Sequence, residues 1–106
     1  MAPTDFHKAS ARALERIDAR LGALELDALD VQLAGDVLTL AFSDGTRYVI
    51  NAHSAAGQIW MAAGTSAWHF DHVPGDDRWV AKRSGDELMS TLARLMRAKL
   101  GTQVSL

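Results

Sequence analysis

The sequence predicts an α+β fold, a two-layer sandwich in which an N-terminal and a C-terminal helix pack on one face of an antiparallel sheet of about six strands. Apolar residues recur at helical spacing near both ends of the chain and at a spacing of two in between. Tight turn sequences separate the short middle runs, whereas parallel pairs would need crossovers of about a dozen residues. A chain of 106 residues has room for one such core, so we expect a single domain over 1–106.

The first helix is predicted over roughly residues 4–23. Its apolar stripe consists of Phe6, Ala13, Leu14, Ile17, Leu21 and Leu24. Charged residues such as Lys8 and Glu15 lie mostly away from that stripe, and Gly22 marks the region where the helix weakens.

The apolar period changes to two after this helix, which indicates strands. Val31 and Leu33 alternate with polar neighbours, and residues 37–42 alternate in the same way. Further short runs are predicted at 47–51, 58–63, 67–73 and 78–82. The sequences between the runs contain turn formers, among them Asp44-Gly45 and Pro74-Gly75. We therefore expect a meander with one face covered by helices and the other in water.

The last helix is predicted to begin at Ser84-Gly85-Asp86-Glu87, which has the spacing of a capping box. Its apolar stripe consists of Leu88, Leu92, Leu95, Met96 and Leu100. Gly101 is a suitable end for the helix. The tail that follows carries Val104 and Leu106, so we expect it to pack back on the core.

The composition excludes several classes of protein. A formal net charge of −2 is not the strongly basic balance of a protein that binds a phosphate backbone. The absence of cysteine excludes disulfides, a thiolate metal site and a cysteine nucleophile. The sequence has no apolar run of about 18 residues, so we expect no membrane span. Its first residues lack a signal pattern, so we expect a cytoplasmic protein.

Strand parity predicts which side chains face water. If Ile59 and Met61 point to the helices, Gln58 and Trp60 point away from them. The same argument turns Asn51 outward on the preceding strand. An exposed tryptophan is typical of a partner-binding surface, although an alternative is that it lies on its own sheet, sheltered by Arg47 or a loop. Three other aromatic residues are expected in or beside the core: Trp68, Phe70 and Trp79.

No catalytic set can be assembled from the sequence. The four histidines match no zinc-binding pattern, and no serine lies in a nucleophile elbow. We expect His53 in a turn, and His69 and His72 on opposite faces of a strand. The sequence also has no glycine-rich phosphate loop, so it indicates a protein that is not an enzyme.

Acidic residues are concentrated in one stretch of the chain. Positions 21–46 contain acids and no basic residue. The acids that can gather between the first helix and the first strand are Asp18, Glu25, Asp27 and Asp30. Carboxylate oxygens bind Fe²⁺, Fe³⁺, Mn²⁺ or Ca²⁺, here weakly because the spacing predicts no closed cage. The alternative is that these acids serve only solubility.

Several motifs occur in order along the whole chain. The most specific is Tyr48-Val49-Ile50-Asn51, followed after six residues by Gln58-Ile59-Trp60. The supporting motifs are Asp5-Phe6-His7, Val37-Leu38-Thr39-Leu40 before Asp44-Gly45, His69-Phe70-Asp71, Arg83-Ser84-Gly85 and Val104-Ser105-Leu106. In these motifs and their spacing the chain resembles the bacterial frataxins of the CyaY type.

The resemblance implies the frataxin fold and a non-enzymatic role in iron–sulfur cluster assembly. It implies that iron, Fe²⁺ or Fe³⁺, binds weakly and exchangeably, with no tightly bound cofactor. The metal residues implied by position are Asp18, Glu25, Asp27 and Asp30, and the partner-binding residues are Asn51, Gln58 and Trp60. The implied partners are a cysteine desulfurase and an iron–sulfur scaffold protein. The implied role is regulation of their complex, iron donation to it, or both, by a monomer that iron can drive into oligomers.

In the family the iron-binding acids form a ridge along the first helix and the first strand, and in this chain the acidic ridge departs from the family pattern. Ala19, Gly22 and Ala23 stand where bacterial members commonly carry acids, and Gln32 replaces another. We therefore expect weaker iron binding than is usual in the family. Two further hypotheses stay open, which are a ferroxidase that stores iron and haem binding through His7, His69 or His72.

Overall fold

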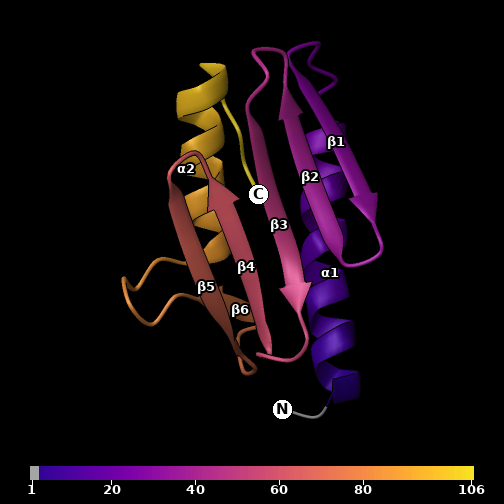
Figure 1. Ribbon diagram of the computed structural model, residues 1–106, viewed down its shortest axis with the longest axis vertical. Coiled ribbons are helices and arrows are strands. Elements are labelled where there is room, and N and C mark those ends of the chain that lie inside the picture. Colours follow the sequence, from indigo (N-terminus) through magenta and orange to yellow (C-terminus); the bar gives the residue numbers. More distant parts are fainter. Residues whose placement is uncertain (1–2) are drawn as a thin grey trace.

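The computed structural model describes residues 3–106, in which a helix lies at each end of a run of six strands (Figure 1). In chain order the elements are α1 (Pro3–Gly22), β1 (Leu29–Ala34), β2 (Val37–Phe42), β3 (Arg47–His53), β4 (Gln58–Ala63), β5 (Ser66–Val73), β6 (Arg78–Val80) and α2 (Leu88–Leu100). This order confirms the predicted α+β architecture. Within the described residues, neither helix is long and apolar enough to cross a membrane.

The six strands form one antiparallel sheet in which each strand pairs with its neighbours in the sequence. The turns are tight, as their sequences predict. Between β2 and β3, the Thr46 amide donates to Asp44 Oδ1 at 2.9 Å. Gly45, at the same turn, has a φ of 90°, which a residue with a side chain adopts only with strain. These connections make the sheet a meander.

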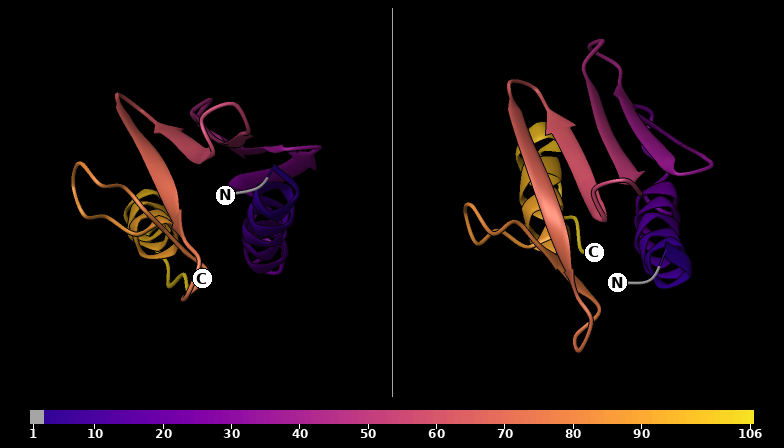
Figure 2. Two further views of the ribbon diagram at one scale, coloured as in Figure 1. Left: turned by 90° about the horizontal axis from the view of Figure 1, so that it is seen from below. Right: turned by 60° about the horizontal axis from the view of Figure 1, so that its bottom comes forward.

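Both helices cover the same face of the sheet and leave the other face open (Figures 1 and 2). The covered face supplies the core because every second strand residue points into it, and Leu38 and Leu40 on β2 are fully buried. From α1, Leu14 and Ile17 meet them. Burying each such side chain stabilises the fold by roughly 1.5–3 kcal/mol.

The aromatic residues take the places that the sequence predicts. Phe70 and Trp79 are buried, and Trp68 is partly buried and packs against the core. The indole of Trp79 meets the ring of Phe6 edge to face, with 5.9 Å between the centroids. This contact joins the start of α1 to β6.

The C-terminal tail packs on the core, as its apolar residues predict. Val104 is buried, and its carbonyl accepts a hydrogen bond from Arg97 Nη1 at 3.0 Å. The carbonyl of Leu106 accepts a hydrogen bond from Arg16 on α1. The tail therefore links the two helices.

The predicted start of the last helix is wrong by one turn. Helix α2 begins at Leu88, and its N-cap is Glu87, whose carboxylate accepts from the amides of Met89 at 2.8 Å and Ser90 at 3.0 Å. Ser84 Oγ instead accepts from the Asp86 amide at 3.3 Å, within a turn. The reason is that the Ser84 hydroxyl accepts a hydrogen bond within the turn before the helix. Glu87 is therefore the residue whose side chain reaches the free amides of the first helical turn.

Two strand boundaries also differ from the prediction. His53 is the last residue of β3 and not part of a turn, because it pairs with Gln58 on β4. The strand predicted over 78–82 ends at Val80, because Ala81 makes its main-chain hydrogen bonds within the turn that follows. Both differences affect the functional surface.

Candidate functional site

The uncovered face of the sheet carries three partly exposed side chains that the sequence marks for partner binding, Asn51, Gln58 and Trp60. Asn51 on β3 lies directly opposite Trp60 on β4, and Gln58 begins β4. Their neighbour Ile59 points the other way and is fully buried. The alternation of β3 and β4 thus brings the three polar and aromatic side chains together on one face.

The indole of Trp60 is stacked between two imidazoles. The centroid of its ring lies 3.9 Å from that of His53, with 11° between the planes. On the other side it lies 4.2 Å from the centroid of His69, with 12° between the planes. The two imidazoles, and not Arg47, shelter the indole. Because both faces of the indole are covered, the exposed part of this residue is mainly the edge of its ring.

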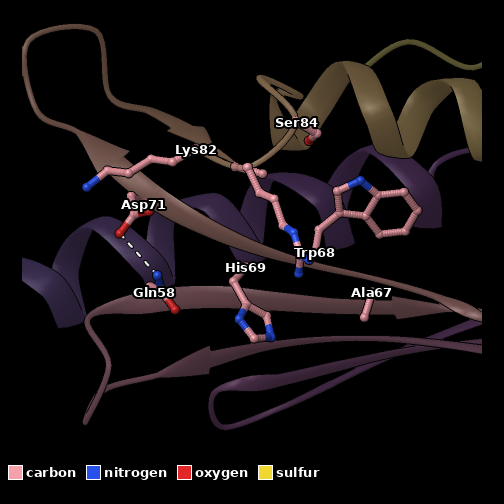
Figure 3. Close-up of a pocket in the computed structure, with 9 residues that line it drawn as sticks. Gln58, Ala67, Trp68, His69, Asp71, Lys82 and Ser84 are labelled. Carbon is pink, nitrogen blue, oxygen red and sulfur yellow. Dashed lines mark hydrogen bonds between the residues drawn. The ribbon is translucent and has the colours of Figure 1, made fainter.

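Hydrogen bonds hold the indole in this orientation. Trp60 Nε1 donates to Gln58 Oε1 at 2.8 Å. Gln58 Nε2 in turn donates to Asp71 Oδ1 on β5 at 3.2 Å (Figure 3). The chain of bonds uses both ends of the Gln58 amide, which settles the side chain's orientation. The orientation of the Trp60 ring is therefore fixed by contacts within the chain.

A small hollow of about 150 Å³ lies beside Trp60. Its walls include Val49, Ala62 and Ala67, which are small or branched side chains from three adjacent strands. Small side chains next to a large aromatic ring create a step in the surface. The hollow can accept one side chain of a partner.

The contacts of His53 and His69 with Trp60 were not predicted from the sequence. The signal was present for His69, because β4 and β5 are joined by the short Gly64-Thr65 turn. Counting back from that turn through the register places Trp60 opposite His69. His53 was missed because it was expected in a turn, whereas it continues β3 and lies diagonally across from Trp60.

The prediction that His69 and His72 lie on opposite faces is confirmed. His72 points to the covered side, where its ring lies 4.7 Å from that of Trp79. His69 stays on the open face with Trp60. Of these two histidines, only His69 therefore belongs to the candidate surface.

The predicted metal residues lie along one side of the molecule. Asp18 is on α1, Glu25 and Asp27 lie in the connection to β1, and Asp30 is exposed on β1 itself. Glu25 has a φ of 49°, so the connection turns sharply there. The geometry gives a line of carboxylates from the helix to the edge strand.

These carboxylates do not converge on one point. Within residues 3–106, no group of three or more histidine, aspartate or glutamate side chains is arranged to hold a metal ion. None of the four takes part in an ion pair in that part of the chain. They are therefore free, separate oxygen donors and not a preformed cage.

Another acid of the same stretch is already neutralised. Lys99 Nζ on α2 lies 2.6 Å from Asp44 Oδ2, and the Thr46 amide donates to the same side chain. The hydrogen bond from Lys99, followed by that from Thr46, lowers the pKa of the Asp44 carboxyl far below its usual value. Asp44 therefore adds little to the negative field near β1.

Comparison with known proteins shows which family the chain belongs to. The family model described as a frataxin-like domain matches residues 1–102. The chain belongs to the frataxin-like family. Two similar proteins are both called iron-sulfur cluster assembly protein CyaY. The one from Vibrio cholerae is 34% identical over 92 residues, 87% of this chain and 86% of its own length. The one from Thioalkalivibrio sulfidiphilus is 34% identical over 107 residues, covering all of both chains.

Solved frataxins share the fold of this frataxin-like chain. The frataxin of Psychromonas ingrahamii superposes with a TM-score of 0.90 at 24% identity, covering 99% of this chain and 97% of its own. A trimeric frataxin of Saccharomyces cerevisiae, described as complexed with ferrous iron, gives a TM-score of 0.78 at 27% identity. It covers 91% of this chain and 88% of its own.

The two candidate regions of the frataxin-like chain lie on one continuous sheet. The acids reach its edge strand β1, and Trp60 stands on β4, with β2 and β3 between them. Adjacent strands are about 4.8 Å apart, so the two regions are separated by roughly 14 Å along the sheet. One large partner can therefore cover both.

Proposed function

We propose that this frataxin-like protein acts in iron–sulfur cluster assembly as an iron-binding partner of a cysteine desulfurase and its scaffold protein. It regulates that complex, donates iron to it, or does both. The observation that carries the proposal is the Trp60 indole, held between two imidazoles on a face that no element of the described chain covers. The names of the CyaY relatives support the assembly role.

The chemistry of the open face supports docking. Tryptophan is enriched among residues that dominate binding energy, and its removal from such a site typically costs about 2 kcal/mol or more. Here Gln58 and the two imidazoles hold the ring in place, so little side-chain entropy is lost on binding. Asn51 supplies an amide donor and acceptor next to the ring.

The acidic ridge supports weak iron binding. Asp18, Glu25, Asp27 and Asp30 offer hard oxygen donors without a fixed geometry, so iron keeps much of its water and exchanges readily. The description of the yeast frataxin as complexed with ferrous iron supports iron as the metal. A loosely held ion at the edge strand can change the local charge beside a docked partner, which links iron to regulation.

A reconstituted desulfurase–scaffold reaction tests the proposal. Cluster formation on the scaffold is followed spectroscopically with and without this protein, across a series of Fe²⁺ concentrations. We expect the protein to change the rate of cluster formation, and the change to depend on iron. Trp60→Ala should remove most of the effect. Lys8→Ala, an exposed change on α1 and therefore on the covered side of the sheet, is the control and should keep it. An unchanged rate at every iron concentration would exclude the proposal.

A further inference from the structure

Two rows of side chains cross the open face of the sheet next to each other. In the first row, Asn51, Trp60 and His69 lie directly opposite one another on β3, β4 and β5. The second row, which we call the small-residue row, consists of Val49, Ala62 and Ala67 on the same three strands. Residues two apart on a strand point to the same face and lie about 7 Å apart. The register therefore places the small-residue row along one side of Trp60.

The difference in size between the two rows forms the hollow of about 150 Å³. Ala62 and Ala67 are exposed and end at a methyl group, whereas the neighbouring Trp60 and His69 carry rings. Val49 completes the walls from β3. The hollow thus follows from the pairing of two alanines, on β4 and β5, beside a tryptophan and a histidine that are also paired.

The indole of Trp60 is prevented from tipping into the hollow. His53 and His69 stack on its two faces, with 3.9 and 4.2 Å between the ring centroids. Its Nε1 donates to Gln58 at 2.8 Å, and Gln58 lies on the side of Trp60 away from Ala62. Rotation of the ring over the small-residue row would break both stacks and this bond. The hollow is therefore held open by contacts within the chain.

The walls of the hollow are uncharged apart from the imidazole of His69. The lining consists of the two rows and Met61, and it contains no aspartate, glutamate, lysine or arginine. On the open face, Arg47 precedes Val49 by two residues on β3, and Asp71 follows His69 by two residues on β5, so both charges stand beyond the two rows. Burying a charged group without a partner costs far more than burying an apolar one. The hollow therefore favours an uncharged, apolar occupant.

A larger pocket of about 530 Å³ shares Ala67 and His69 with the hollow but differs in charge. It lies between β5 and the turn after β6, where Ala81 makes its main-chain hydrogen bonds and leaves the sheet. Its lining includes the acid Asp71 and two exposed basic residues, Lys82 and Arg83 (Figure 3). Charges of both signs meet in this pocket, so its electrostatics favour no single class of ligand. The hollow beside Trp60 is the one with walls of a single chemical kind.

We propose that the hollow beside Trp60 receives one aliphatic side chain, of the size of leucine or isoleucine, from the partner that docks on the open face. An apolar cavity of similar volume, roughly 150 Å³, accommodates a group as large as benzene. The partner is that of the proposed function, so the assignment rests on that function and adds the kind of residue that the partner presents. Ala62 and Ala67 set the size of this residue, because a larger side chain at either position would occupy the hollow.

A titration of the isolated ¹⁵N-labelled protein tests the hollow without any partner. The probes are the N-acetyl amides of leucine, glutamate and lysine, which differ only in their side chains. We expect the leucine probe alone to shift the backbone amides of Val49, Ala62 and Ala67 in a saturable way. The shifts should disappear in Ala62→Leu and remain in Ala11→Leu, the same substitution at an exposed position of α1. Equal shifts from the three probes, or none from leucine, would overturn the proposal.

Binding to the desulfurase–scaffold complex tests the hollow in the assembly. Ala62→Leu adds apolar surface to the open face, so a non-specific hydrophobic contact would become tighter. A hollow that receives a side chain should instead lose affinity when it is filled, by about tenfold or more. Ala67→Leu fills the hollow from β5 and should act in the same way, whereas Ala11→Leu should stay within about twofold of the native affinity. Unchanged or tighter binding by both filled variants contradicts the proposal.

Failure of this proposal can be told apart from failure of the proposed function. If the native protein does not bind the complex, the proposed function fails, and the leucine probe still decides what the hollow accepts. If Trp60→Ala loses affinity while both filled variants keep it, the docking surface stands and the hollow is excluded from it. If sedimentation shows self-association that Ala62→Leu abolishes, the hollow serves a second copy of the chain and the proposal is wrong.

Discussion

Arg12 on α1 holds Asp77, in the turn between β5 and β6, through two parallel hydrogen bonds. Nε donates to Oδ2 at 3.1 Å and Nη2 donates to Oδ1 at 3.0 Å. His72 Nε2 lies 2.7 Å from the same Oδ1. Asp77 has a φ of 51°, a conformation that turns its side chain to both partners. This pair joins the start of the fold to its far hairpin, on the opposite side from the candidate surface.

Asp77 makes the stability of the fold sensitive to acid. The hydrogen bond from Arg12, and then that from His72, lowers the pKa of the Asp77 carboxyl to about 2. Because this value is below the usual 3.8 of an aspartate, the contribution is complete above about pH 4 and is lost as the pH falls through 2. Asp77→Asn should cost about 1 kcal/mol at pH 7, a modest value because the carboxylate is 47% exposed.

Urea unfolding at a series of pH values measures this effect. The difference between Asp77→Asn and the native protein should shrink between about pH 4 and pH 2. Asp76→Asn is the matched control in the same turn, because among residues 3–106 Asp76 pairs only with the exposed Arg78, at 3.3 Å. A difference that stays constant down to pH 2 would contradict the assignment.

Loss of the Trp60 ring should weaken partner binding without unfolding the protein. We expect Trp60→Ala to reduce affinity for the desulfurase–scaffold complex by about 30-fold, equivalent to about 2 kcal/mol. Trp60→Phe keeps a ring between the imidazoles but loses the N–H that Gln58 accepts, so its loss should be smaller. Calorimetry gives both affinities, and circular dichroism checks the fold. Native affinity in the alanine variant would exclude Trp60 from the interface.

Iron should bind weakly to the ridge. In an anaerobic Fe²⁺ titration followed by calorimetry, we expect no tight stoichiometric site, because the carboxylates do not converge. Asp27→Ala/Asp30→Ala should weaken the binding that is seen. Asp36→Ala, an exposed acid in the turn between β1 and β2, serves as the control. A tight site at one equivalent would contradict the expectation that the few acids of the ridge bind iron weakly.

Oxygen uptake separates iron binding from ferroxidase activity. Oxidation of iron by paired metal ions needs carboxylates that hold two ions close together, about 3.5–4 Å apart. We expect oxygen consumption after Fe²⁺ addition to match that of buffer with the same iron. Faster, saturable consumption that disappears in Asp27→Ala/Asp30→Ala would favour the ferroxidase hypothesis instead.

The N-cap of α2 can be tested by two substitutions. Glu87→Ala removes the acceptor for two helix amides and should cost about 1 kcal/mol in the free energy of unfolding. Ser84→Ala should cost less than about 0.5 kcal/mol, because Ser84 caps only a turn. Chemical denaturation measures both. A larger cost for Ser84→Ala than for Glu87→Ala would instead support the capping box predicted from the sequence.

Much of the fold follows from local patterns. The helical stripe of α1 and the alternation of β2 match the buried residues, because burial on one side of an element imposes its period on the sequence. The outward direction of Trp60 follows from the same alternation. Its two imidazole neighbours were not found, because His53 lay past the predicted end of its strand and the register was not counted across the sheet.

The amino-acid sequence by itself determined the order of elements, the open face of the sheet, the dilute acidic stretch and the family. Each of these depends on residues that are near one another in the chain. The tertiary structure alone decided the His53–Trp60–His69 stack, the Arg12–Asp77 clamp and the early end of β6 at the pocket. These features join residues from different elements, so they depend on register and on competition between turns and strands for main-chain hydrogen bonds.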